Sequence, residues 1–76
     1  MTGKIIDLIR EMHPYEQIAE DTELVESGVL NSLSIVSLIT QLEDEFGVEI
    51  ADDAITAKNF SSVREIVLLI EGSSKV

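Results

Sequence analysis

The chain has 76 residues and carries fifteen acidic but only five basic side chains, which gives a net charge of −10 at pH 7. This length is enough for one small domain that buries roughly 60–65% of its unfolded surface. The acidic balance excludes nucleic acid as a partner, because its phosphates would be repelled. The absence of cysteine excludes disulfides and thiolate metal sites.

Charge is distributed unevenly along the chain. No lysine or arginine lies between Arg10 and Lys58, whereas eleven acids follow Glu11 within that span. Two interpretations stay open: an ordinary solvated surface, or a surface that steers the protein toward basic patches on partners. By contrast, the sixteen residues from Ser27 to Leu42 contain no charge. Because a membrane-spanning helix needs roughly 20 apolar residues and this segment also holds several hydroxyl and amide side chains, no membrane span is expected.

The N-terminal segment is predicted to form an amphipathic helix. Thr2 is the candidate N-cap, and His13–Pro14 should end the helix because the residue before a proline avoids the α region. The segment lacks the continuous apolar run of a signal peptide, so a cytoplasmic protein is expected. The apolar residues that recur at helical spacing are Ile5, Ile6, Ile9 and Met12.

The stretch from Tyr15 to Leu30 shows no helical period and is predicted to be a long loop. A loop of this length in a small domain is more often functional than incidental. Its candidate anchors to the core are Ile18, Leu24, Val29 and Leu30.

A second helix is predicted from Asn31–Ser32 to about Phe46. Asn31 is a good N-cap residue, and Gly47 should end the helix in a left-handed conformation. The apolar stripe of this helix comprises Ile35, Leu38, Ile39, Leu42 and Phe46, with Leu33 and Val36 broadening it.

The C-terminal third is predicted to hold a short helix and a third main helix. Asp52 or Asp53 could cap one or two turns over residues 53–57. Ser62 and Glu65 have the spacing of a capping box, and Gly72 should end the helix that follows. The buried stripe of that helix is expected to be Val63, Ile66, Val67 and Ile70.

These elements predict an all-α fold, namely a small bundle of three main helices and one short helix. The chain is expected to form a single domain over residues 1–76, with residues 72–76 as a loose tail. No segment alternates with a period of two over enough residues to predict a strand.

The chemical motifs of an enzyme are missing. The only histidine, His13, stands at a helix end, where a capping or surface role is expected rather than a place in a catalytic triad. The acids lack the order of a calcium-binding loop, and the glycines are isolated rather than grouped as in a phosphate-binding loop. Runs such as Glu43–Glu45 are expected to be solvated. We therefore expect no catalytic residue, no metal site and no enzymatic activity.

Ser32 is the most distinctive candidate site residue. If Asn31 caps the second helix, Ser32 occupies its first position, where backbone N–H groups and the helix dipole favour a phosphate. Ser27 would lie in the loop, and Ser34 and Ser37 inside the helix. The residues alone leave a second interpretation equally open, in which Ser32 is only an alternative cap.

Residues 28–50, GVLNSLSIVSLITQLEDEFGVEI, resemble the core of the acyl carrier protein superfamily, whose members carry an Asp-Ser-Leu motif at the start of the second helix. Residues 59–70, NFSSVREIVLLI, are similar to the last helix of that family. The resemblance implies an acyl-carrier-like four-helix bundle. It also implies that Ser32 receives 4′-phosphopantetheine from coenzyme A, with Asn31 and Leu33 as its motif neighbours.

In this family the terminal thiol of the arm carries an acyl or aminoacyl group as a thioester, so the cysteine-free chain would borrow its reactive sulfur from the cofactor. The implied partners are a phosphopantetheinyl transferase, an acyl- or aminoacyl-activating ligase, and downstream acyl-transferring enzymes with basic docking patches. A monomer is expected.

The match departs from the family pattern around the attachment serine. Asn31 stands where the family usually has aspartate, and Ser34 and Ser37 occupy positions where fatty-acid carriers tend to have acids. Modification is therefore expected to depend less on charge near Ser32 than it does in fatty-acid carriers.

The cargo stays open between several classes. Residues 26–32, ESGVLNS, resemble the Glu-x-Gly-Leu-Leu-Asp-Ser run of D-alanyl and other free-standing aminoacyl carriers, which an AMP-forming ligase loads. Fatty-acid, polyketide and nonribosomal peptide biosynthesis are the other pathways in view. The alternative from a different class is an unmodified acidic helical interaction module.

Overall fold

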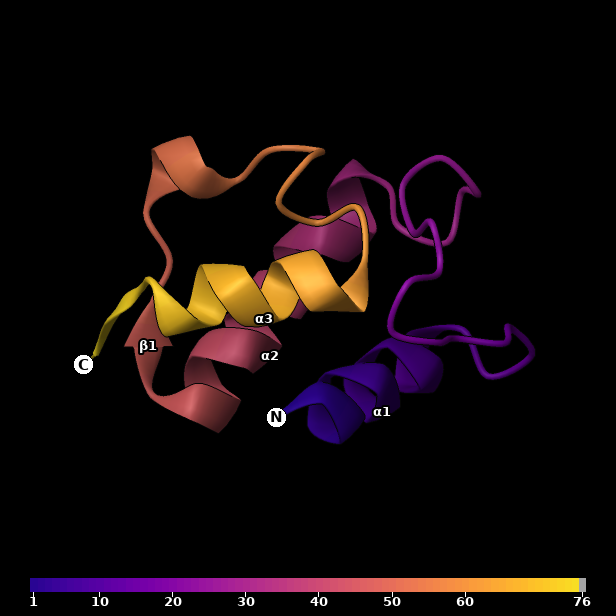
Figure 1. Cartoon of the computed structure of the whole chain (residues 1–76), viewed down its shortest axis with the longest axis horizontal. Helices are drawn as coiled ribbons and strands as arrows, with labels where there is room; N and C mark the ends of the chain where they lie inside the picture. The colour runs from indigo at the N-terminus through magenta and orange to yellow at the C-terminus, as the bar shows by residue number, and fades with distance from the viewer. Residues whose placement is uncertain (76) are drawn as a thin grey trace.

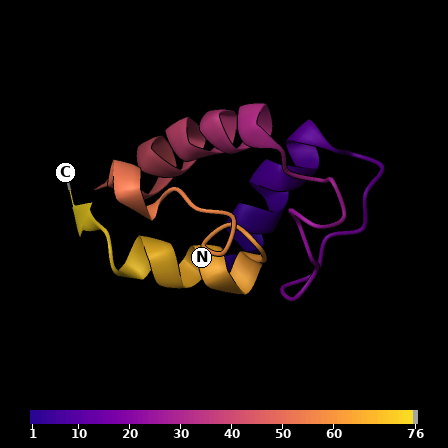
Figure 2. The same cartoon turned by 90° about the horizontal axis from the view of Figure 1, so that it is seen from above.

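The computed structural model describes residues 1–75 and contains three α-helices in that range: α1 (Thr2–Met12), α2 (Ser32–Phe46) and α3 (Val63–Glu71). α1 packs against both α2 and α3 (Figure 1). In the view from above, α2 and α3 run along opposite sides of the segment that connects them (Figure 2). The loop between α1 and α2 lies at one end of the long axis, and the last described residues, drawn in yellow, lie at the other (Figure 1).

The core takes one face from each helix and several residues from the loops. In the long loop, Leu24, Val29 and Leu30 are buried, and Ile18 packs against the core from a half-buried position, which confirms the four predicted anchors. The buried residues of the core are Ile5, Leu8, Ile9, Leu24, Val29, Leu30, Leu38, Leu42, Val48, Ile50, Phe60, Val63, Ile66 and Ile70.

Two of the predicted helix ends are confirmed by local hydrogen bonds. Gly47 ends α2 at φ 62° and ψ 41°, and its N–H donates to the carbonyl of Glu43. The Ser62 side chain caps α3 by accepting from the N–H of Glu65 at 3.2 Å. These ends were predictable because they depend only on residues within one helical turn.

The start of α1 and the outer face of α2 differ from the predictions. Thr2 is the first helical residue rather than the cap; Met1 takes the cap position, and no side chain bonds there. Leu33 and Val36 do not extend the buried stripe but are exposed. At 100° per residue they project away from Leu38 and Leu42, which face the core, so the apolar stripe was predicted too wide.

The predicted short helix is present only as one 3-10 turn, so a count of four helices is not confirmed. Residues Asp52–Ala54 form a single turn of 3-10 helix, η1, with Ala51 rather than an aspartate at its cap. The turn ends early because the carbonyl of Ala54 accepts hydrogen bonds from the N–H of Thr56 and from the side-chain amide of Asn59. An α-helix would need that carbonyl to pair four residues ahead.

The end of the chain is not a loose tail over its described part. Ser74 and Lys75 form strand β2 (Ser74–Lys75), which pairs antiparallel with β1 (Val48–Glu49), Val48 opposite Lys75. Val76, the last residue of the predicted tail, lies outside the described residues. The fold is therefore mostly helical, as predicted, with a small two-stranded sheet that the sequence did not indicate. The pairing joins segments far apart in the sequence, which short-range periodicity cannot detect.

Two members of the acidic run at the end of α2 have structural partners. The Glu43 carboxylate accepts a hydrogen bond from the N–H of Ile50 at 2.9 Å, which holds the chain as it leaves β1. Glu45 lies 3.7 Å from the ammonium of Lys4 on α1. The prediction of a wholly solvated acidic face is therefore wrong for Glu43, and Asp44 is the exposed member of the run without such a role.

Acid–acid repulsion should make the stability of this fold depend on salt. Two ion pairs occur among residues 1–75, Lys4–Glu45 and Arg64–Glu20, and both are well exposed, so each contributes only about 0–1 kcal/mol. Because the remaining acids repel one another and salt screens them, raising NaCl from about 0.01 M to about 0.5 M is expected to raise the melting temperature by about 5 °C.

Thermal unfolding followed by circular dichroism measures this shift. Magnesium chloride at matched ionic strength serves as the comparison, because general screening is then equal and any further stabilisation reports binding of the divalent cation to the acids. A melting temperature that stays the same in both salts would contradict the prediction.

Candidate functional site

Ser32 lies at the first position of α2, and its side chain is exposed. Asn31 precedes it in an extended conformation and caps the helix: its Oδ1 accepts from the N–H of Ser34 at 3.0 Å. The interpretation of Ser32 as a mere alternative cap is therefore wrong. Since Asn31 already caps the helix, the Ser32 hydroxyl is exposed to solvent and does not cap it.

The loop that leads to Ser32 is fixed by main-chain hydrogen bonds rather than by regular structure. The N–H of Leu24 donates to the carbonyl of Ser61, and the carbonyl of Leu24 accepts from the N–H of Leu30, both at 2.8 Å. Gly28 makes the intervening turn at φ 85°, a conformation that suits glycine. Leu24 thus connects the segment before α3 to the residue just ahead of the Asn31 cap.

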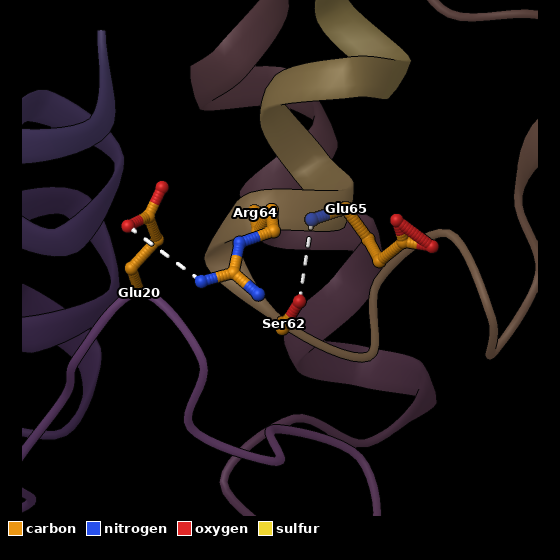
Figure 3. Close-up of polar contacts among 4 residues, drawn as sticks. All are labelled: Glu20, Ser62, Arg64 and Glu65. Carbon is orange, nitrogen blue, oxygen red and sulfur yellow. Dashed lines mark hydrogen bonds and ion pairs between the residues drawn. The ribbon is translucent and has the colours of Figure 1, made fainter.

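A second set of contacts ties the same loop to the start of α3. Figure 3 shows Arg64 reaching toward Glu20, with their charged atoms 3.9 Å apart, beside the Ser62 cap. The N–H of Arg64 also donates to the carbonyl of Glu20 at 3.1 Å. Both side chains of the ion pair are exposed, so the backbone bond is the stronger restraint. The N-terminal end of α3 therefore helps to position the loop that precedes Ser32.

A mostly apolar cavity of about 580 Å³ opens beside Ser32. The loop before α2 forms one wall, the first turns of α2 form another, and residues 55–57 form the third. Its lining residues are Val25, Gly28, Leu30, Asn31, Ser32, Ile35, Val36, Ile55, Thr56 and Ala57.

The electrostatic setting of Ser32 favours an anion. No acid lies in the first turn of α2, and the uncharged stretch continues to Leu42. Helix geometry leaves the N–H groups of Ser32 and Leu33 without intrahelical partners, and the positive end of the helix dipole is here. A phosphate on the Ser32 hydroxyl would meet these groups without facing a neighbouring carboxylate of the same turn.

The structure brings together the three predicted site residues and adds others that the sequence did not indicate. Leu33 follows Ser32 but is 83% exposed. Ile55 and its neighbours reach the cavity only through the path of the chain between η1 and α3. Ser37 is exposed further along α2, and Ser34 is half-buried with its N–H bonded to Asn31. Within residues 1–75, no cluster of potential metal ligands was found, nor a helix long and apolar enough to cross a membrane.

Removing the cap should destabilise the helix that carries Ser32. Asn31→Ala deletes the Oδ1 that accepts from Ser34, and the loss of such a cap costs about 0.5–2 kcal/mol in the free energy of unfolding. Asn31→Asp keeps the acceptor and should keep most of the stability. Urea denaturation of both variants measures the difference, and equal unfolding free energies for Asn31→Ala and the natural chain would contradict the role of the cap.

Comparison with known proteins identifies the chain's relatives. A sequence-family model described as "Phosphopantetheine attachment site" matches residues 4–70, most of the chain. The chain belongs to the acyl carrier protein superfamily.

Three curated relatives illustrate the similarity of this carrier to known proteins. The acyl carrier protein of Lactobacillus acidophilus is 37% identical over 71 residues, which cover 91% of this chain and 86% of the relative. The acyl carrier protein of Campylobacter hominis is 34% identical over 55 residues, which cover 72% of this chain and 67% of the relative. The acyl carrier protein homolog of Mycoplasmopsis pulmonis is 36% identical over 59 residues, which cover 78% of this chain and 77% of the relative. No solved structure matches the chain significantly.

The family assignment gives the carrier its prosthetic group, 4′-phosphopantetheine. The residues around Ser32 fit such a group, because they offer an exposed hydroxyl, free N–H groups at a helix start and an apolar cavity alongside. When bound, the group supplies a thiol that forms thioesters. Acyl carrier proteins are non-catalytic carriers.

Proposed function

We propose that Ser32 is the residue that bears 4′-phosphopantetheine and that the chain presents an acyl group, held as a thioester, to partner enzymes. A phosphopantetheinyl transferase would join the Ser32 hydroxyl oxygen to the phosphorus of the phosphopantetheinyl group of coenzyme A. The bond between the two phosphates of coenzyme A breaks, 3′,5′-ADP leaves, and the hydroxyl proton passes to a base of the transferase.

The observation that carries this proposal is the position of Ser32 relative to its cap. Asn31 takes over the hydrogen bonding at the helix start, so the neighbouring hydroxyl is free at the point where a phosphate is best accommodated. The other serines of the uncharged stretch lack this position. The Ser27 hydroxyl donates to the carbonyl of Leu24 at 3.4 Å, and Ser34 and Ser37 lie inside α2.

Asn31 and Leu33 have supporting roles in this proposal. Asn31 positions Ser32 by holding the first turn of α2, and as an amide it places no negative charge beside the phosphodiester. Leu33 projects outward next to the attachment point, where an enzyme acting on Ser32 has to approach. Neither residue carries chemistry of its own.

The cargo is proposed to be an acyl group, with an aminoacyl group as the alternative. The mostly apolar lining of the cavity beside Ser32 favours an apolar acyl chain, as do the relatives named acyl carrier protein. The ESGVLNS run favours the aminoacyl alternative, including D-alanine. An activating ligase, followed by acyl-transferring enzymes, would be the partners in either case, and the carrier would work as a monomer in the cytoplasm.

Intact-mass measurement tests both the attachment at Ser32 and the class of the cargo. Incubation with coenzyme A and a broad-specificity phosphopantetheinyl transferase should add the mass of one phosphopantetheinyl group, and peptide mapping should place it on Ser32. The resulting thiol form is then offered fatty acids or amino acids with ATP and the matching ligases. A second mass gain with amino acids alone would replace the acyl proposal by the aminoacyl alternative.

A further inference from the structure

A groove of about 320 Å³ lies between α3 and the segment that runs from β1 through η1. Both walls contribute to its apolar lining, with Ala51 and Ala54 on the η1 side and Leu68 and Leu69 on α3. None of the residues that line this groove lines the cavity beside Ser32. It is therefore a separate feature of the surface, and we call it the α3 groove.

Leu68 is the exposed large apolar side chain of the α3 groove. It is 58% exposed, whereas Ile66 and Ile70 of the same helix are buried. At 100° per residue, Leu68 points away from both isoleucines, and it does not belong to the core or to the half-buried side chains packed against the core. Because an apolar side chain of this size is stabilised by leaving water, the α3 groove is suited to burying an apolar group of another molecule.

The charges in the walls of the α3 groove are negative. Glu49 lines the groove, and Asp52 and Asp53 stand between its two alanines; all three acids are exposed. The two segments that form the walls, residues 49–57 and 65–74, contain no lysine or arginine, and Lys75 lines a different cavity. Neither of the two ion pairs among residues 1–75 involves these acids. The groove thus combines an apolar lining with acids that no neighbouring cation neutralises.

This combination decides which kind of molecule fits. Nucleic acid, an anionic lipid surface and a second copy of this chain, whose net charge is −10, would each bring negative charge against Glu49, Asp52 and Asp53. Among the described residues, these acids do not form a cluster that could hold a metal ion. A basic segment with one apolar face satisfies both features, because it buries the exposed leucine and places positive charge beside the acids.

We propose that the α3 groove docks a basic amphipathic segment of a partner enzyme. An apolar side chain of that segment packs on Leu68, and its lysines or arginines face Glu49, Asp52 and Asp53. Burial of the leucine supplies the central contact, and the charges around it select for a basic partner. This docking goes beyond the proposed attachment at Ser32 and does not depend on it.

A partner held in the α3 groove would leave Ser32 accessible. η1 and the C-terminal end of α3 lie towards one end of the long axis, whereas α2 begins nearer the long loop at the other end (Figure 1 and Figure 2). One enzyme would therefore hold the carrier at the α3 groove while another acts on Ser32.

The probe for this proposal is a fluorescently labelled peptide of about 18 residues that forms a helix with leucine on one face and lysine on the other. Fluorescence anisotropy measures its Kd for the full chain. Two comparison peptides carry glutamine in place of leucine or glutamate in place of lysine, and each should bind at least about tenfold more weakly. In NMR spectra of the ¹⁵N-labelled chain, the largest shift changes are expected at residues 49–54 and 68–74.

Leu68→Gln tests the apolar contact, since leucine and glutamine have similar helix propensities. The Kd of this variant for the leucine–lysine peptide is expected to rise about tenfold. Val36→Gln is the matched control, because Val36 on α2 is 63% exposed but does not line the α3 groove. Its Kd should stay within about twofold of the natural chain. Circular dichroism should show equal helix content in both variants.

The double variant Asp52→Asn/Asp53→Asn tests the acids. Its Kd is expected to rise about fivefold at about 0.05 M NaCl and by less at about 0.5 M, because salt screens the lost attraction. Asp21→Asn/Glu23→Gln removes the same number of charges from exposed residues of the long loop. That control should change the Kd less than about twofold, since the loop lies at the other end of the molecule (Figure 1).

Three results overturn the docking proposal. The first is that the leucine–lysine peptide does not bind. The second is that Leu68→Gln and Val36→Gln have the same Kd for it. The third is that the shift changes centre on the first turns of α2 instead of the α3 groove. Failure of the attachment at Ser32 is distinct, because the natural chain would then gain no mass from coenzyme A and a transferase while its Kd for the peptide stayed the same.

Discussion

Replacing Ser32 by alanine is expected to abolish the mass gain from coenzyme A and a phosphopantetheinyl transferase. The variant lacks the one hydroxyl that stands at the first position of a capped helix. Alanine is well tolerated inside a helix, and Asn31 still supplies the cap, so the fold should survive and the loss should be complete rather than partial.

Two matched controls make this result specific to position 32. Ser34→Ala and Ser37→Ala remove hydroxyls from the same helix, and both variants should gain the full mass of one phosphopantetheinyl group. Circular dichroism should show equal helix content in all three variants. A mass gain that persists in Ser32→Ala would place the attachment on another residue, whereas a natural chain that gains no mass would favour the alternative of an unmodified acidic interaction module.

The sequence predicted those parts of the fold that depend on neighbours within one turn. The Asn31 cap, the left-handed Gly47 and the Ser62 cap can all be predicted from the sequence, and each is held by a hydrogen bond between residues three or four positions apart. The long loop was predicted for the same reason, since no helical period could be found in it. Local chemistry is sufficient for features of this kind.

Features that depend on distant residues were missed. The pairing of Val48 with Lys75 joins segments far apart in the sequence, and neither strand is long enough to show alternation. Periodicity also could not show that α2 packs through a narrow stripe that leaves Leu33 and Val36 in water. Which apolar side chains a helix buries is set by how many neighbours it has, and that is a property of the whole fold.

The candidate site likewise has one part that the local sequence predicts and one part that only the fold shows. Ser32, Asn31 and Leu33 were identified from the motif they form in sequence. The wall of the cavity contributed by Ile55 and residues 56–57 became visible only in the structure, because that segment is far from Ser32 along the chain. The segment is held in place by the Asn59 amide, which donates to the carbonyl of Ala54, and by burial of the next residue, Phe60.

Phe60→Ala is expected to cause the largest loss of stability among single substitutions in the core. Phe60 is the largest fully buried side chain, so its removal leaves a cavity in the core, and its own N–H donates to the carbonyl of Thr56 in the segment that walls the Ser32 site. Truncating a buried phenylalanine costs about 3–5 kcal/mol. A chain of this length has a total unfolding free energy on the order of 4–11 kcal/mol, so most of the stability could be lost.

Urea denaturation of Phe60→Ala measures this loss, with Tyr15→Ala as the matched aromatic control. Tyr15 is 98% exposed in the long loop, so its removal should change the unfolding free energy by less than about 0.5 kcal/mol. Because Phe60 directly precedes Ser61, whose carbonyl holds Leu24, the loop ahead of Ser32 should loosen together with the core. A loss below about 1 kcal/mol would show that the surrounding side chains collapse into the vacated space, and that the wall at Ile55 does not depend on Phe60.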